Sequence, residues 1–113
     1  MNEQKRDGYY RKLVANARAI ISYQVGLPVG CMKMERILYW IGYECGEAPD
    51  FTVFKNYFAE ARDLPLSSER LNYSREALRR DDARLVAINL KYREEVIDAC
   101  FEIIERYGGG KSG

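Results

Sequence analysis

The sequence predicts an all-α fold, a small bundle of about four helices in which the C-terminal helix is long. Two observations lead to this prediction. Apolar residues recur at intervals of three and four, and no stretch alternates apolar and polar residues for long enough to form a sheet. A chain of 113 residues can bury one hydrophobic core. We therefore expect one helical domain over residues 1–107 and a flexible glycine-rich tail over residues 108–113.

The first helix is predicted from about Tyr9 to Tyr23, and the sequence Gly-Leu-Pro-Val-Gly at residues 26–30 is expected to end it. Proline supplies no amide hydrogen and glycine permits a tight reversal, so together they stop a helix. Such a break suits either a ligand-binding loop or the corner where two helices meet. The helix is marked by one stripe of apolar side chains: Tyr10, Leu13, Val14, Ala17, Ile20 and Ile21.

A second helix is predicted through the sequence CMKMERILYWI, which begins at Cys31. Its core-facing seam consists of Cys31, Met34, Leu38 and Ile41. A third helix is expected to follow Asp50, whose carboxylate can accept free amide hydrogens as an N-cap. The side chains expected to point inward from this third helix are Phe51, Phe54, Tyr57, Phe58 and Ala61.

The longest helix is predicted between about Ser74 and Tyr107, after a loop with the sequence RDLPLSSERLN. This segment contains neither glycine nor proline, and its apolar residues step by threes and fours throughout. At 1.5 Å per residue such a helix extends roughly 50 Å. It is therefore either kinked or longer than the bundle on which it packs.

Residue types that build common catalytic and metal sites are scarce. The chain has no histidine, the most frequent general base and zinc ligand. We expect Cys31, Cys45 and Cys100 to be reduced thiols packed in the core, because they are odd in number and widely spaced. The first ten residues lack the apolar segment of a signal peptide, and no stretch is long enough to span a membrane. These observations predict a cytoplasmic protein without membrane contact, metal or cofactor.

The C-terminal sequence ERYGGGKSG contains the Gly-Lys-Ser that ends a phosphate-binding P-loop. The P-loop pattern also needs a glycine at the position where Glu105 stands, with a strand before it and a helix after it. Here a predicted helix precedes the sequence and no helix follows it. We therefore interpret Gly108 as the cap of the last helix and the remaining residues as a flexible tail.

Charged residues are nearly balanced, with a net charge of +1. The segment REALRRDDAR at residues 75–84 mixes both signs at helical spacing, so we expect mutual pairing on an exposed face, for example of Asp82 with Arg79 or Arg84. Alternatively, Arg75 and Arg79 contact an acidic protein surface. The adjacent aspartates would repel phosphate, which argues against nucleic acid as the partner.

The chain is rich in tyrosine, and three large aromatic residues lie close together on the second predicted helix. Tyr39, Trp40 and Tyr43 cover more than one side of that helix, so one core cannot receive all three. Two interpretations remain open. The rings either pack on two neighbouring helices of the bundle, or they anchor a partner protein together with Arg36, as aromatic and arginine residues often do in interfaces.

These observations favour a non-enzymatic module that binds another protein, such as an immunity or antitoxin-like inhibitor of a toxin or effector. Binding to a second copy of the chain is also open. One alternative is a small hydrolase or nucleotide-handling enzyme that uses carboxylates and arginines. A second alternative is an RNA-binding module that stacks bases on tyrosine and arginine side chains.

The order of these segments resembles a bacterial family known as domain of unknown function 2489. The resemblance extends over about residues 10–105 and rests on an Ala-Arg-Ala helix, a break that ends in glycine, an apolar helix, an aromatic helix and a charged helix. The positions that carry it are Ala17, Arg18, Ala19, Gln24, Gly30, Pro65 and Arg70. It implies a helical fold, and it implies that Gly-Leu-Pro-Val-Gly is a helix corner. The family supplies no catalytic residues.

Overall fold

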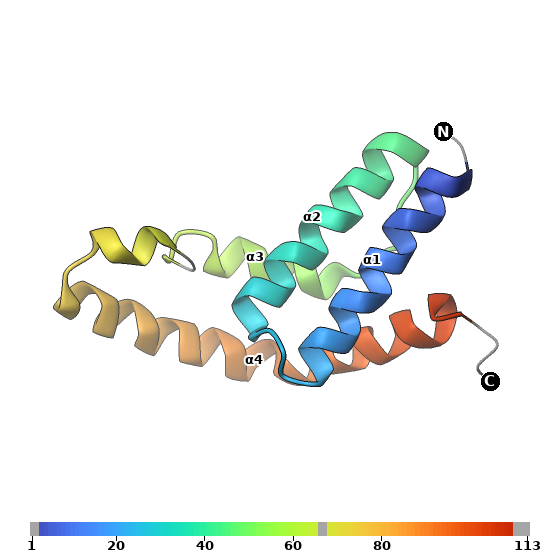
Figure 1. The fold of residues 1–113 in the computed structure, drawn as a ribbon. Coiled ribbons are helices and arrows are strands. Elements are labelled where there is room, and N and C mark those ends of the chain that lie inside the picture. Colours follow the sequence, from blue (N-terminus) through green and yellow to red (C-terminus); the bar gives the residue numbers. More distant parts are fainter. Residues whose placement is uncertain (1–2, 66–67, 110–113) are drawn as a thin grey trace.

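The computed structural model describes residues 3–65 and 68–109, and within these residues it is helical without strands. The all-α prediction is therefore confirmed (Figure 1). A short 3-10 helix, η1, precedes the last helix. The elements in chain order are α1 (Glu3–Ile21), α2 (Leu27–Cys45), α3 (Thr52–Ala61), η1 (Ser68–Asn72) and α4 (Arg75–Tyr107).

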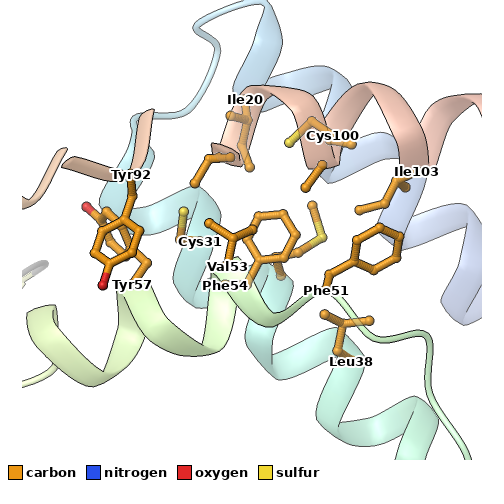
Figure 2. Close-up of a cluster of buried hydrophobic side chains, with 14 of the residues drawn as sticks. Ile20, Cys31, Leu38, Phe51, Val53, Phe54, Tyr57, Tyr92, Cys100 and Ile103 are labelled. Atoms are coloured by element: carbon orange, nitrogen blue, oxygen red, sulfur yellow. The ribbon is translucent and has the colours of Figure 1, made fainter. Parts of the chain in front are cut away.

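The four α-helices meet around one core. Helix α1 packs against α2 and α4, and α3 packs against α2 and α4 from the other side. Figure 1 shows α1 and α2 as a hairpin that lies across the C-terminal half of α4. Figure 2 shows side chains from these helices converging in the core. The completely or almost completely buried side chains are Leu13, Ala17, Ile20, Cys31, Met34, Ile41, Phe54, Tyr57, Ala61, Val96, Cys100 and Ile103.

The corner between α1 and α2 differs from the prediction. Helix α1 begins at Glu3 and ends at Ile21, so it starts and ends earlier than expected. Pro28 does not stop α1 but lies in the first turn of α2, where a missing amide hydrogen costs nothing because helix starts leave those hydrogens unpaired. Gly30 is required for close packing, because a Cβ there would lie 2.5 Å from Cγ1 of Ile20. The corner is thus formed by residues 22–26, and the rest of the Gly-Leu-Pro-Val-Gly segment begins α2.

The connection from α2 to α3 begins at Gly46, whose positive φ of 86° ends α2 in the left-handed region that glycine tolerates. The predicted N-cap is wrong by one residue, because Phe51 occupies the cap position of α3. Asp50 instead accepts a hydrogen bond from the Thr52 hydroxyl at 2.9 Å. The inward side of α3 is also shifted, since Val53 is buried whereas Phe58 is only half-buried.

Helix α4 confirms the prediction of a long C-terminal helix. The Ser74 hydroxyl caps it by accepting a hydrogen bond from the Ala77 amide at 3.1 Å. No side chain between residues 75 and 87 is buried, and Ile88 is the first that is. The helix is therefore longer than the bundle, which accounts for the elongated shape of 48 × 28 × 21 Å.

Charge pairing on the projecting part of α4 also differs from the prediction. Asp82 pairs with Arg70 of η1, not with Arg79 or Arg84, through two contacts of 2.7 and 3.1 Å. This forked contact holds η1 against α4. At the other end, the Gly108 amide donates to the carbonyl of Ile104 and caps α4 as expected. Residues 110–113 of the predicted tail lie outside the described residues.

Candidate partner-binding face

Three aromatic side chains of α2 form an exposed cluster, which we call the aromatic ridge: Tyr39, Trp40 and Tyr43. The Trp40 ring meets both tyrosines edge to face, with centroids 5.4 Å from Tyr39 and 5.5 Å from Tyr43. The two tyrosine rings stack at 6.3 Å. Nevertheless, 60% of Tyr39, 42% of Trp40 and 71% of Tyr43 is exposed. The interpretation in which these rings pack on neighbouring helices of the bundle is therefore wrong.

The position of the ridge follows from how α2 fills the core. Successive residues of a helix are about 100° apart, so Tyr39 and Tyr43 cannot share a face with Leu38 and Ile41. The seam of Cys31, Met34, Leu38 and Ile41 is buried as predicted, and it binds α2 to the other helices. Helices α1 and α3 lie on either side of that seam. The ridge is left on the remaining, solvent-facing side of α2.

On one side of the ridge lies a groove of about 490 Å³ between α1 and α2, which we call the basic groove. Its charged lining residues are Lys12 of α1 with Lys33 and Arg36 of α2, and no carboxylate among the described residues lines it. None of these three cations forms an ion pair with a described residue. Lys12 lies over the ring of Tyr9, with its ammonium nitrogen 5.7 Å from the ring centroid. Trp40 joins the groove to the ridge.

The base of the basic groove is fixed by a buried amide that the sequence analysis missed. Asn16 is only 9% exposed, and its side-chain amide donates to the Gly30 carbonyl at 2.9 Å. This bond joins α1 to α2 where the small Gly30 lets them approach. A buried polar group is costly unless it is paired, so this amide specifies how the two helices align. An asparagine within an otherwise apolar stripe was the available sequence signal.

The N-terminal end of α1 is joined to α2 by a small charge network. The Tyr9 hydroxyl donates to the Glu44 carboxylate, which also pairs with Lys5. The hydrogen bonds from Lys5 and Tyr9 lower the pKa of Glu44, and the bond to Glu44 raises the pKa of Tyr9. The negative charge of Glu44 is thus already matched and does not offset the cations of the basic groove.

On the other side of the ridge, a second groove of about 560 Å³ separates α2 from the segment that leads into α3. Tyr39 and Tyr43 line it together with Glu35, Asp50 and Lys55. Burial raises the pKa of Glu35, and the nearby Lys55 opposes that rise. This carboxyl group in a groove is the nearest approach to an acid–base catalyst in the described chain.

The two remaining candidate residues do not join this face. Arg75 and Arg79 occupy the first turns of α4 and are exposed. Figure 1 shows these turns at the end of α4 that projects away from the α1–α2 hairpin. Arg36, in contrast, lies one turn before Trp40 and lines the same groove. The structure therefore brings together Arg36, Tyr39, Trp40 and Tyr43, and it separates Arg75 and Arg79 from them.

Elsewhere the described residues offer little reactive chemistry. Cys31 and Cys100 are buried in the core as predicted, and burial raises the pKa of each to about 12, which disfavours the nucleophilic thiolate. Cys45 is half-buried. Across residues 3–65 and 68–109, no group of three His, Cys, Asp or Glu side chains is placed to hold a metal ion. None of the helices described has both the length and the apolar character needed to cross a membrane.

Comparison with known proteins adds no assignment. No protein-family model, no curated protein and no solved structure matches the chain. The family resemblance stated from the sequence therefore stays an expectation.

Proposed function

We propose that this chain is a non-enzymatic protein-binding module that holds a partner protein on the aromatic ridge. The observation that carries the proposal is the exposure of three mutually packed rings on one helix. Tryptophan, tyrosine and arginine contribute most of the binding energy in many interfaces, and Arg36 lies one turn away from Trp40. The ridge and its arginine thus have the composition of an interface centre.

The ridge is also pre-organised for binding. Its rings already restrict one another through edge-to-face and stacked contacts, so they lose less side-chain freedom when a partner covers them. The helix that carries them is fixed by fully buried residues, among them Met34 and Ile41. A rigid aromatic surface of this kind binds at a lower entropic cost than a flexible one.

The chemistry of the described residues supports binding more than catalysis. Glu35 has a raised pKa, but a hydrolase that uses two carboxylates needs a second one near it. The nearest candidate in the same groove, Asp50, accepts a hydrogen bond from Thr52 and has an exposed side chain. If the chain were a hydrolase, Glu35→Gln should abolish its enzymatic activity. If it is a binding module, the unmodified chain should have no enzymatic activity.

Within the class of binding modules, we propose an inhibitor of the immunity or antitoxin kind. A small chain with a rigid aromatic surface is suited to cover the active site of a larger partner. The specific requirement is that one molecule of this chain should abolish the activity of one molecule of its partner. If the partner stays fully active in the complex, the chain is not an inhibitor, but the proposal that it is a binding module still holds.

The proposal is tested by photo-cross-linking in the cells from which the protein comes. Benzoylphenylalanine replaces Tyr43, which is 71% exposed, in one variant and Phe101 of α4, which is 51% exposed, in the control. We expect a discrete adduct with one other protein at position 43 and none at position 101. Equal adducts at both positions, or none at either, would contradict the proposal. An adduct of the chain with itself would show that the partner is a second copy of the chain.

A further inference from the structure

We infer that the basic groove receives an acidic segment of the partner protein, with one apolar side chain of that segment inserted between α1 and α2. The inference rests on the proposed function and adds the chemistry of the partner. Its starting point is the position of the groove, because Trp40 belongs to the ridge and also lines the groove, together with Arg36 one turn before it. A partner centred on the ridge would therefore reach the groove without a change in backbone structure.

The charge of the groove selects the chemistry of the segment. Lys12, Lys33 and Arg36 are exposed, and none forms an ion pair with a described residue. Other basic residues of the same chain are paired, such as Arg70 with Asp82 and Lys91 with Glu60. Three cations without a carboxylate along one groove give a positive potential that favours a negatively charged ligand.

The lining of the groove between the cations is apolar. Ala15 and Ala19 lie one turn apart on α1, and Ile37 faces the same groove from α2. The two alanines have the smallest side chains that carry a Cβ, and this leaves space beside Ile37. An apolar side chain flanked by carboxylates would bury its surface in that space while its neighbours meet the lysines and arginine. The Asn16 amide keeps the groove at a fixed width by joining α1 to Gly30.

The surroundings of the groove favour an acidic protein segment over a nucleic acid. A bound strand would follow a row of cations and continue across the surface with its phosphates. Here the cations end at the ridge, and beyond the ridge Glu35 and Asp50 line the second groove, between α2 and the segment that leads into α3. The net charge of the whole chain is only +1. A short segment that ends at the ridge avoids those carboxylates.

The inference is tested with the full chain and a synthetic peptide in which one leucine is flanked by aspartates and glutamates. The matched peptide carries asparagine and glutamine at the same positions, and oligouridylate is the third probe. In two-dimensional ¹⁵N–¹H NMR titrations, we expect the acidic peptide to shift the amides of residues 12–19 and 33–40. The shifts should weaken at about 0.5 M salt, where exposed charges are screened. Equal shifts with the amide peptide, shifts with oligouridylate alone, or no shifts would each overturn the inference.

Charge-reversal variants then test whether the cations of the basic groove bind the acidic peptide. Lys12→Glu combined with Lys33→Glu should weaken binding of the acidic peptide by about tenfold or more, because attraction at two sites becomes repulsion. The matched control is Arg84→Glu on α4, an exposed arginine outside the groove, which should leave the affinity unchanged. Circular dichroism confirms that each variant is folded. An equal loss of affinity in the control would overturn the assignment to the groove.

The failure of this inference is distinguishable from the failure of the proposed function. The protein identified by cross-linking is purified and titrated with Tyr43→Ala and with the Lys12→Glu, Lys33→Glu variant, which leaves Arg36 beside the ridge unchanged. Loss of affinity in both variants supports both statements. If only Tyr43→Ala loses affinity, the ridge binds the partner and the groove inference is wrong. If neither variant loses affinity, both statements are wrong.

Discussion

Replacement of Tyr43 by alanine should cost little stability although it removes a large aromatic side chain. Tyr43 is 71% exposed, and its ring packs on the other two rings of the ridge. The matched comparison is Tyr57→Ala. Tyr57 is 1% exposed, packs edge to face on Tyr92 at 5.9 Å and donates its hydroxyl hydrogen to Asn89. The two substitutions delete the same atoms from opposite environments.

The expected magnitudes follow from the buried areas. An aromatic side chain buries about 200 Å² when it is fully enclosed, so Tyr43 buries roughly 60 Å². At about 25 cal/mol per Å², its removal should lower the free energy of unfolding by about 1.5 kcal/mol at most. Removal of Tyr57 leaves a cavity and an unpaired Asn89, for which about 3–5 kcal/mol is expected. The expected difference between the variants is therefore at least about 1.5 kcal/mol.

Urea denaturation followed by circular dichroism measures both free energies under the same conditions. The two variants should unfold cooperatively with the slope of the unmodified protein, so that the midpoints report stability directly. Tyr43→Ala should retain a midpoint close to that of the unmodified chain, and Tyr57→Ala should not. If Tyr43→Ala lost as much stability as Tyr57→Ala, the ridge would belong to the core and could not be a free binding surface.

Three further predictions concern the fold. Gly30→Ala should lower stability by about 1–3 kcal/mol by overpacking Ile20, and combining it with Ile20→Ala should cost less than the two single changes together in a double-mutant cycle. Burial raises the pKa of Cys31 and Cys100 from 9.0 to about 12, so the neutral thiols favour folding. Their contribution is complete below pH 9 and is lost as the pH rises towards 12, by about 1.4 kcal/mol per thiol and pH unit. Urea titrations at several pH values should show that the free energy of unfolding declines less steeply with pH when both cysteines are replaced by alanine. An equally steep decline would contradict the contribution of the two thiols. Ser74→Ala should remove the cap of α4 and cost about 1 kcal/mol in the same assay, whereas Ser74→Asp should not.

The helices and most of their buried residues could be predicted because they depend on periodicity within one segment. The seam of α2 and the unbroken α4 are examples. The residues at which the helices begin and end were harder to predict, because capping depends on the tertiary position of single residues. Pro28 can either end a helix or begin one, and only the packing of Gly30 on Ile20 places it in the first turn of α2.

The candidate site could be predicted only in part, for a related reason. The spacing of Tyr39, Trp40 and Tyr43 shows that one core cannot bury them all, but the sequence does not say which neighbours α2 has. The basic groove could not be predicted from the sequence, because Lys12 and Lys33 lie on different helices and line one groove only when α1 and α2 are paired. The sequence also makes Arg75 and Arg79 candidates for contact with an acidic partner, but it does not show that the projection of α4 places them away from the ridge.

The most direct test of the proposed function is the dissociation constant of the cross-linked and purified partner, measured by calorimetry. The unmodified chain is compared with Tyr43→Ala and with Phe101→Ala, which removes an exposed ring from α4. We predict that Tyr43→Ala weakens binding by about 2 kcal/mol, or about 30-fold, while the protein stays folded. Phe101→Ala should bind like the unmodified chain. Equal affinity of the unmodified chain and folded Tyr43→Ala would contradict the assignment of partner binding to the aromatic ridge.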